Sequence, residues 1–183
     1  LSPLAACPSS PDNIKPVGAL GEPAVSQVVI GSCTNGSLKD LVMAADVLAG
    51  RTVHPDVSLA IAPGSRQVLQ MLAESGALAK LVQAGARILE SACGPCIGQG
   101  MSPANDTITV RTFNRNFAGR SGTKGDQTYL VSPETAVAAA LTGKLVDPTT
   151  LGIAYPEWEM PATFHIDDSL IIAPPAAGAK GEI

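Results

Sequence analysis

Three cysteines in this chain have a type and spacing that could hold a metal centre. Cys33 follows an apolar segment, and Cys93 and Cys96 lie in the tetrad CGPC after another apolar segment, residues 86–91. Thiolates are soft ligands that select zinc, copper or iron–sulfur clusters. Three such thiols are an odd number for disulfides, and four cysteines in 183 residues do not make a disulfide scaffold. The sequence therefore indicates a reducing compartment in which thiols serve chemistry or metal.

Several kinds of thiol chemistry fit this spacing. Structural zinc prefers four closed ligands, but neither His54 nor His165 lies at ligand spacing from the CGPC pair. A 4Fe–4S cluster held by three cysteines leaves one iron open, and an open iron acts as a Lewis acid. Thiol–disulfide exchange requires a cysteine at a helix N-terminus, whereas residues 97–106, IGQGMSPAND, predict a poor helix start. Buried structural cysteines are the remaining alternative.

A second group of polar residues could bind an anionic substrate. The segment NRNFAGR, residues 114–120, places Arg115 and Arg120 in one loop. Guanidinium groups offer a planar fork of donors that matches carboxylates, although loop arginines are also commonly solvated. The further candidates for the surroundings of a cluster are Asn114, Thr34 and Asn35. Amides and hydroxyls of this kind also form turns and helix caps, which is their ordinary alternative role.

The elements that must position these residues alternate between strand and helix. The predicted strands are residues 26–33, 57–63, 86–91, 106–113 and 128–131. The predicted helices are residues 37–50, 64–76, 77–85 and 132–143. This alternation predicts an α/β fold of three layers, α/β/α, with a mostly parallel sheet covered on both faces. Ligands of such sheets bind beyond the carboxyl ends of the strands, where the cysteine and arginine motifs both fall.

The composition of the chain changes towards both ends. We expect residues 1–24 to be an irregular lead-in, residues 25–146 to form the α/β domain, and residues 147–183 to be an extended segment. Within the last of these, SLIIAP (169–174) is a candidate strand. The chain starts with Leu1 and shows no signal peptide, so we interpret it as a piece of a longer protein.

Charge and composition exclude two classes of partner. The net charge is −4 and aromatic residues make up 3% of the chain, whereas nucleic-acid binders show basic faces or stacking rings. No apolar run approaches the roughly 20 residues that a membrane helix needs. We therefore expect neither a nucleic-acid nor a membrane partner, and a cytoplasmic location with the mitochondrial matrix as the alternative.

Three motifs in one order resemble the aconitase superfamily. They are IGSCTNGS, ACGPCIGQ and NRNFAGRSG, and ACPSSPDN and SPETAVAAALTGKL extend the likeness over about residues 4–183. The resemblance implies the cluster-bearing third domain of aconitase, an α/β/α unit. The related 3-isopropylmalate dehydratases, the nearest other branch, share GSCTN and NRNFxGR but usually read CxMC at the second cysteine motif. The tetrad CGPC therefore favours aconitase.

The resemblance also implies residue roles and a reaction. Cys33, Cys93 and Cys96 would be the ligands of a 4Fe–4S cluster, and Arg115 and Arg120 would bind the carboxylates of a tricarboxylic acid. The implied enzyme is a hydro-lyase that converts citrate to isocitrate through cis-aconitate. The alternative within the class is a 3-isopropylmalate or homoaconitate dehydratase. The alternative of another class is a thiol–disulfide oxidoreductase that uses the CGPC pair.

The resemblance further implies partners that the sequence does not contain. Aconitases carry two preceding α/β domains and a C-terminal swivel domain, which complete the substrate site. We therefore expect this chain to bind the cluster and to be inactive without those domains. Cys7 matches no ligand motif and is expected to be a small buried or partly exposed thiol. An RNA-regulatory role, which some aconitases have, is disfavoured by the acidic charge.

Overall fold

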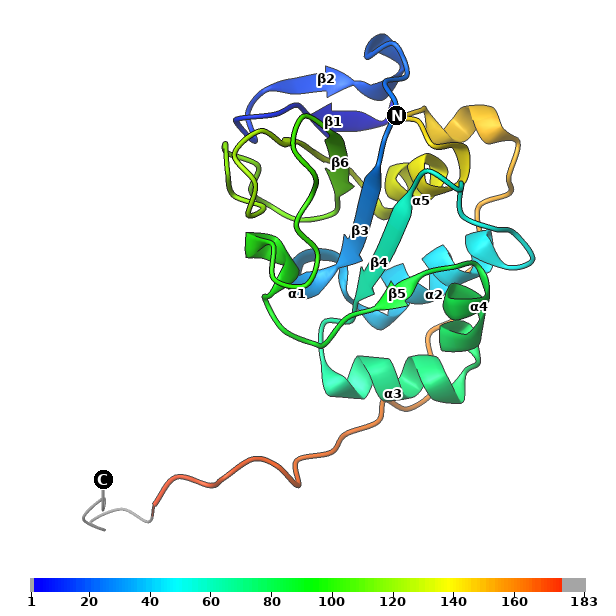
Figure 1. The fold of residues 1–183 in the computed structure, drawn as a ribbon. Coiled ribbons are helices and arrows are strands. Elements are labelled where there is room, and N and C mark those ends of the chain that lie inside the picture. The colour runs from blue at the N-terminus through cyan, green and yellow to red at the C-terminus, as the bar shows by residue number, and fades with distance from the viewer. Residues whose placement is uncertain (1, 176–183) are drawn as a thin grey trace.

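The computed structural model describes residues 2–175, which form a seven-stranded sheet with helices packed against it (Figure 1). The parallel strands are β3 (Gln27–Gly31), β4 (Ser58–Ala62), β5 (Arg87–Ile88), β6 (Ile108–Arg111) and β7 (Gln127–Leu130). The order across the sheet is β2-β1-β7-β6-β3-β4-β5. The predicted α/β class with a mostly parallel sheet is confirmed.

The strand order reverses next to the central strand. From β3 the chain moves outward to β4 and β5, and then returns to the opposite side of β3 to form β6 and β7. The switch point therefore lies between β3 and β6, whose parallel register pairs Val29 with Arg111. Open α/β sheets bind ligands in the crevice at the carboxyl ends of the strands at such a switch point.

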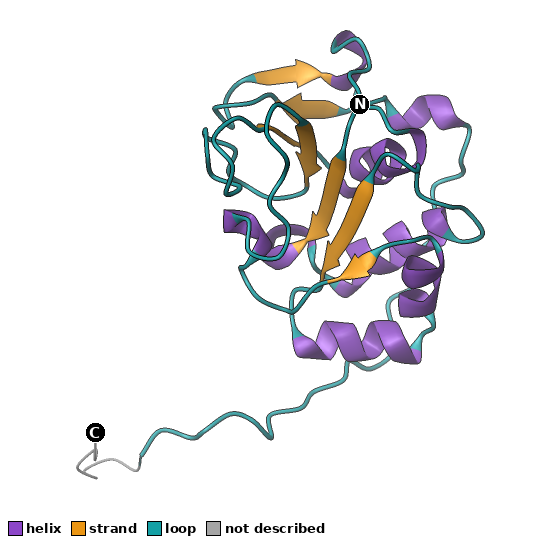
Figure 2. Cartoon of the chain, viewed as in Figure 1, coloured by secondary structure: helices purple, strands orange, loops and turns teal. Residues whose placement is uncertain are grey.

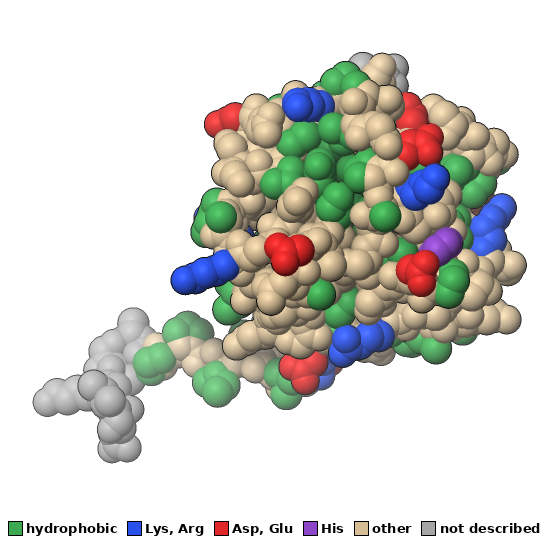
Figure 3. Space-filling model, turned by 45° about the horizontal axis from the view of Figure 1, so that its top comes forward, with side chains coloured by type: hydrophobic (Ala, Val, Ile, Leu, Met, Phe, Trp, Pro, Cys, Tyr) green, Lys and Arg blue, Asp and Glu red, His purple; other side chains and the backbone are tan. Residues whose placement is uncertain are grey.

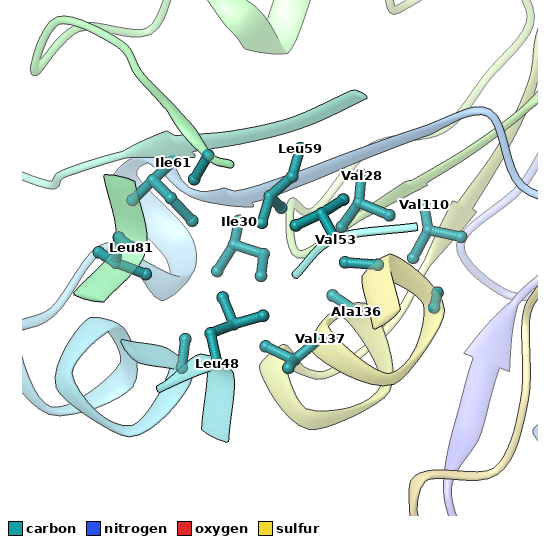
Figure 4. Packing of buried hydrophobic residues seen from close by; sticks show 14 of the residues in the cluster. Val28, Ile30, Leu48, Val53, Leu59, Ile61, Leu81, Val110, Ala136 and Val137 are labelled. Atoms are coloured by element: carbon teal, nitrogen blue, oxygen red, sulfur yellow. The ribbon is translucent and has the colours of Figure 1, made fainter. Parts of the chain in front are cut away.

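Four helices cover one face of this sheet. They are α2 (Leu38–Leu48), α3 (Arg66–Glu74), α4 (Ala77–Gln83) and α5 (Pro133–Thr142). Their apolar sides share one core cluster with Val28 and Ile30 of β3, and Figure 4 shows Leu48 and Val137 pointing towards these strand residues. The hydroxyls of the helix-capping residues Ser37, Ser65 and Ser132 each accept a backbone N–H bond in the first turn. The four predicted helices are thus all present.

The opposite face of the sheet carries loops and one helical turn. A second, smaller cluster joins Val29 and Ala60 of the sheet to Cys96 and Met101 of the loop that follows β5. This loop contains the 3-10 turn η2 (Pro95–Ile97) and runs beside the sheet as coil (Figure 2). The third layer of the fold is therefore built from this loop and η2 in the described part of the chain.

The lead-in differs from the irregular segment that its composition predicts. It forms β1 (Leu4–Ala6), β2 (Ile14–Pro16) and the 3-10 turn η1 (Val17–Ala19), and β1 and β2 are antiparallel. Ala6 pairs with Leu130, which adds this hairpin to the edge of the sheet. Three-residue strands with prolines have no readable periodicity, so their partner strand β7, and not their own sequence, decides that they pair.

The C-terminal segment leaves the sheet after the turn η3 (Pro148–Leu151). Trp158 packs against the main core, but SLIIAP forms no strand because no other strand of residues 2–175 lies beside it. That prediction was wrong, and Ile171 and Ile172 are instead exposed. Figure 3 shows apolar side chains standing out along this segment. No helix in the described ranges has the length and apolar character needed to cross a membrane.

Candidate metal centre

The turn after β3 presents Cys33 at the switch point. Gly31 has φ +117° and precedes the one-turn helix α1 (Ser32–Asn35), whose first residue, Ser32, has φ +63°. A Cβ on Gly31 would lie 2.1 Å from the carbonyl oxygen of Ala62, so only glycine fits between β3 and the end of β4. A non-glycine residue at positive φ is strained, and such strain clusters at functional sites. The result is an exposed Cys33 thiol just beyond the strand end.

The loop after β5 brings the CGPC pair to the same place. Cys93 is exposed, and Cys96 is buried in η2. The hydroxyl of Ser32 lies 3.1 Å from Cys96 Sγ, so the loop that carries Cys33 contacts the loop that carries the pair. Figure 1 shows η2, in green, beside α1. The two loops that carry the cysteine motifs are therefore in contact at this edge of the sheet.

The three thiols are close enough to influence one another. Burial raises the pKa of the Cys96 thiol, and the hydrogen bond from Ser32 opposes this shift. A hydrogen bond with Cys93 and the negative charges that Cys93 and Cys33 would carry raise the same pKa further. Like charges that disfavour one another in this way need a cation to be held together as thiolates. Metal ions bound at the three sulfurs would supply that cation.

The donor set is compatible with a cluster that spreads its ligands over several irons. All four cysteines are free. Within residues 2–175, no three His, Cys, Asp or Glu side chains converge tightly enough to hold a single metal ion. A 4Fe–4S cluster attaches each thiolate to a different iron, so its ligands surround a volume and do not meet at one point. Three soft thiols from two contacting loops fit that requirement.

The structure around Cys93 differs from a redox CGPC site. Pro95, Cys96 and Ile97 form a single 3-10 turn, which ends at Gly98 in the left-handed conformation with φ +92°. A thiol–disulfide exchanger relies on a helix N-terminus to lower the pKa of its cysteine. No α-helix begins at Cys93 in the described chain, so the attacking cysteine of such a pair lacks this support. The thiol–disulfide alternative therefore gains no structural support.

The loop after β6 carries the remaining candidates. Asn114 and Arg115 are exposed directly beyond the strand, and Arg120 is half-buried. Arg120 Nε is buried without a hydrogen-bond partner among residues 2–175, and its guanidinium lies 5.8 Å from the centre of the Phe117 ring. Neither arginine forms an ion pair with the described part of the chain. Both guanidinium groups are thus available to bind an anion.

The two candidates that follow Cys33 have different environments. Thr34 is exposed, and its Oγ1 lies 3.9 Å from Cys33 Sγ. Asn35 is half-buried at the end of α1. The neighbouring loop after β4, PGSR, contacts this turn because the N–H of Gly64 donates to the carbonyl of Gly36 at 2.9 Å.

Three residues near these motifs were not predicted from the sequence. Ser32 contacts Cys96, and its only signal is its place before Cys33. Asn116 is of a type that commonly forms turns, yet it is 2% exposed and its Nδ2 donates to the carbonyl of Cys7 at 2.7 Å. Arg111 is completely buried at the end of β6, where its signal is a charged residue directly after the apolar Val110. Buried polar residues of this kind hold loops that carry function.

Comparison with known proteins identifies the family of this chain. The aconitase family (aconitate hydratase) profile matches residues 10–143. The chain is 48% identical over 149 residues to 3-isopropylmalate dehydratase large subunit 1 of Methanopyrus kandleri, covering 81% of this chain and 36% of that protein. It is 42% identical over 152 residues to the 3-isopropylmalate dehydratase large subunit of Nitratidesulfovibrio vulgaris strain DP4, covering 82% of this chain and 36% of that protein.

These relatives correct one expectation and set the scale of the match. The chain spans about a third of the length of these proteins, 36% for the one from Methanopyrus kandleri. They are named as isopropylmalate dehydratases, so the preference for citrate that was based on CGPC finds no support in them. The match of the profile over residues 10–143 and the identity to these relatives lead to one conclusion: the chain belongs to the aconitase family.

Proposed function

We propose that this chain is the cluster-binding part of a hydro-lyase that removes water from a 3-isopropylmalate-type hydroxy acid and adds it back. The contact between Ser32 and Cys96 carries the proposal, because it joins the two loops that hold the three free thiols at the switch point. The names of the relatives support the substrate class. Citrate is the second substrate candidate, since the family profile is described as aconitate hydratase.

Cys33, Cys93 and Cys96 would hold a 4Fe–4S cluster at this edge of the sheet. When bound, such a cluster supplies a Lewis acid at the iron that lacks a protein ligand, and this favours departure of the substrate hydroxyl. Exposure of Cys33 and Cys93 leaves one side of the site open to substrate, while Cys96 is held from behind by the protein. The three thiols would therefore hold the metal centre on the solvent side of the switch point.

Arg115 and Arg120 would bind the carboxylates of the substrate. A guanidinium can make two parallel hydrogen bonds to a carboxylate, which fixes its orientation as well as its position. Arg120 has a buried Nε that lacks a partner among residues 2–175, and a substrate oxygen could satisfy it. The substrate class fits this pair because an isopropylmalate-type acid has two carboxylates.

The proposal includes further protein components. The relatives are named large subunits, and the match to this chain covers 36% and 35% of their lengths. We infer that catalysis needs the remaining domains and a second, smaller subunit, which would provide the base that removes a proton from the substrate. The chain alone is expected to bind iron and sulfide without dehydrating either acid.

Anaerobic reconstitution with iron and sulfide tests the ligand assignment. We expect the purified chain to gain visible absorption and bound iron, and the variants Cys33→Ser, Cys93→Ser and Cys96→Ser to lose most of both. Cys7→Ser is the matched control, because Cys7 is also free but lies in the lead-in. A Cys33→Ser variant that took up the full complement of iron would contradict the assignment.

A second assay tests the substrate class. The complete enzyme that contains this chain, with its smaller subunit, is expected to have a higher kcat/KM for 3-isopropylmalate than for citrate. Arg115→Lys and Arg120→Lys variants should raise KM, because lysine cannot make the paired hydrogen bonds of arginine. Preference for citrate would replace the substrate class and leave the cluster assignment intact.

A further inference from the structure

Arg111 places a positive charge inside the protein directly behind the cysteine loop. It lies on the face of β6 opposite the helices, because its neighbour Val110 belongs to the main core. The Arg111 side chain is 0% exposed, which is rare for arginine unless an anion accompanies it. No ion pair of Arg111 is formed within residues 2–175. A buried cation with neutral neighbours is costly, so its presence calls for a physical reason.

The guanidinium is tied to the loop that carries Cys96. Its Nη1 donates to the carbonyl oxygen of Pro95, whose peptide bond leads into Cys96, and its Nη2 donates to the carbonyl of Met101 at 2.8 Å. The two carbonyls lie on either side of the end of η2. One rigid, planar group therefore fixes both ends of the segment that presents the buried thiol.

The remaining hydrogen-bond acceptors of the guanidinium belong to residues of the sheet. Nη2 also donates to Gln27 Oε1 at 2.8 Å, and Nε donates to Thr109 Oγ1 at 3.3 Å. Gln27 in turn donates to the carbonyl of Ser102 at 3.1 Å, which is a second tie between sheet and loop. All acceptors of Arg111 are neutral, so its charge is not cancelled by direct contact. Burial lowers the pKa of Arg111 to about 10, which leaves it charged at neutral pH.

The charge of Asp126 opposes the lowering of the Arg111 pKa by burial, yet Arg111 shares no hydrogen bond with Asp126. Asp126 is already hydrogen-bonded by the hydroxyl of Thr128. On the loop side, the guanidinium binds the carbonyl of Pro95, the residue directly before Cys96, so it lies behind the thiol that would hold the cluster. A 4Fe–4S cluster with three thiolate ligands carries net negative charge, which the same cation would offset.

We propose that Arg111 is a positioning residue that also acts electrostatically. It anchors the loop that carries Cys93 and Cys96, and it supplies the buried counter-charge for the anionic cluster. The inference rests on the proposed function of the three thiols. Without the counter-charge, the cluster is held less firmly and is harder to reduce. Charge and hydrogen bonding near the ligands are established determinants of cluster potential.

Three variants separate the anchoring role from the electrostatic one. Arg111→Met removes both the bonds and the charge, while Arg111→Lys keeps the charge and loses most of the bonds. Gln27→Glu keeps a hydrogen-bond acceptor for Arg111, and its carboxylate neutralises the charge of the guanidinium. The variant loses the hydrogen bond that Gln27 donates to the carbonyl of Ser102. Arg87→Met is the matched control. The guanidinium of Arg87 contacts the sulfur of Met101 in the same loop, but Arg87 is exposed to solvent.

Hydrogen exchange of the metal-free chain measures anchoring without any cluster. Residues 92–103 are expected to exchange faster in Arg111→Met, and at the wild-type rate in Arg87→Met. Equal exchange in wild type and Arg111→Met would overturn the anchoring role. If Arg111→Met does not fold, Arg111→Lys provides the same comparison, because a lysine cannot reach both carbonyls.

The reconstituted chain measures the counter-charge. Chelator is expected to remove iron about tenfold faster from Arg111→Met than from wild type, the usual order for loss of a group that supports metal ligands. The reduction potential should fall in both Arg111→Met and Gln27→Glu, and remain near that of wild type in Arg111→Lys and Arg87→Met. Arg111→Lys decides between the two roles, because a merely structural Arg111 would give Arg111→Lys the potential of Arg111→Met.

The outcomes distinguish this inference from the function on which it rests. If wild type takes up the cluster and the potentials of Arg111→Met and Gln27→Glu equal its own, the counter-charge role is wrong and the ligand assignment stands. If wild type takes up no iron or sulfide, the proposed function and the counter-charge role both fail. Hydrogen exchange then still decides whether Arg111 anchors the loop.

Discussion

Ser32 Oγ lies 3.1 Å from Cys96 Sγ, although 64 residues of sequence separate the two. Both groups are buried, and the contact joins the turn after the first parallel strand to the loop after the third. The exposed thiols of Cys33 and Cys93 lie on these same two segments. The pair is therefore the structural junction around which the proposed metal centre is organised.

Ser32→Ala is expected to lower the free energy of unfolding of the metal-free chain by about 1 kcal/mol, the usual net value of one buried hydrogen bond. Ser32→Gly should cost less, because glycine relieves the positive φ of +63° at this position. Urea denaturation of the three proteins provides the measurement. Wild-type stability in Ser32→Ala would show that the contact to Cys96 contributes nothing.

Gly31→Ala is expected to be among the most damaging substitutions, with a loss of about 4 kcal/mol. Its new Cβ would lie 2.1 Å from the backbone oxygen of Ala62, which cannot move without disturbing β4. Gly50→Ala is the control, since Gly50 has φ +69° but no atom within 4 Å of an added Cβ, and should lose only about 1–2 kcal/mol. Thermal or urea unfolding compares them, and equal losses would contradict the close approach.

Asn116→Ala should lower the free energy of unfolding by about 2 kcal/mol, because it leaves buried carbonyls without a donor. Its Nδ2 donates to the carbonyl of Cys7 at 2.7 Å and to that of Thr128 at 3.3 Å, so it ties the arginine loop to the lead-in and to β7. Asn114→Ala, at an exposed position of the same loop, should change stability by less than about 0.5 kcal/mol. Similar losses in both variants would show that the tie is not specific to Asn116.

Acid is expected to release the C-terminal segment from α3. Hydrogen bonds from the side chain and backbone of Ser169 lower the pKa of Asp167 below its ordinary 3.8, and Arg66 contributes through its charge. Since the pKa is lowered in the folded chain, this stabilisation is present above pH 3.8 and is lost as pH falls through the lower folded value. Trp158, the one tryptophan of the chain, lies on the same segment and reports its release by fluorescence.

Asp167→Asn is the control for that titration. The variant loses the ion pair with Arg66 at every pH, so its Trp158 emission at neutral pH should resemble that of the acidified wild type. The change in emission on acidification should be smaller than in wild type. An identical acid response in both proteins would assign the transition to other carboxylates.

Local sequence rules predicted the regular part of this fold well. Ser132 and Pro133 begin α5, and Gly143 ends it in the left-handed conformation, as capping preferences require. The apolar β3 and β4 could be read because buried parallel strands form continuous apolar runs. The contact of Ser32, next to Cys33, with Cys96 follows from topology, since the carboxyl ends of parallel strands share one edge.

The parts that sequence reasoning missed depend on distant partners. The pairing of Ala6 with Leu130 depends on β7, and no sequence pattern within residues 1–24 predicts it. The buried state of Arg111 depends on carbonyls of Pro95 and Met101, which only the folded loop provides. The failure of SLIIAP has the same origin, because an apolar run becomes a strand only where another strand offers its backbone groups.

The strand order also determines when the central sheet can be completed during synthesis. On the ribosome, β3 emerges long before its neighbour β6, although Val28 and Val110 are partners in the finished sheet. Until then, the edge of β3 that will pair with β6 has unpaired backbone N–H and C=O groups, which invite pairing with a wrong strand. The segment bearing Cys33 is thus synthesised early and paired late, so the proposed cluster would be inserted only after the whole sheet has been translated.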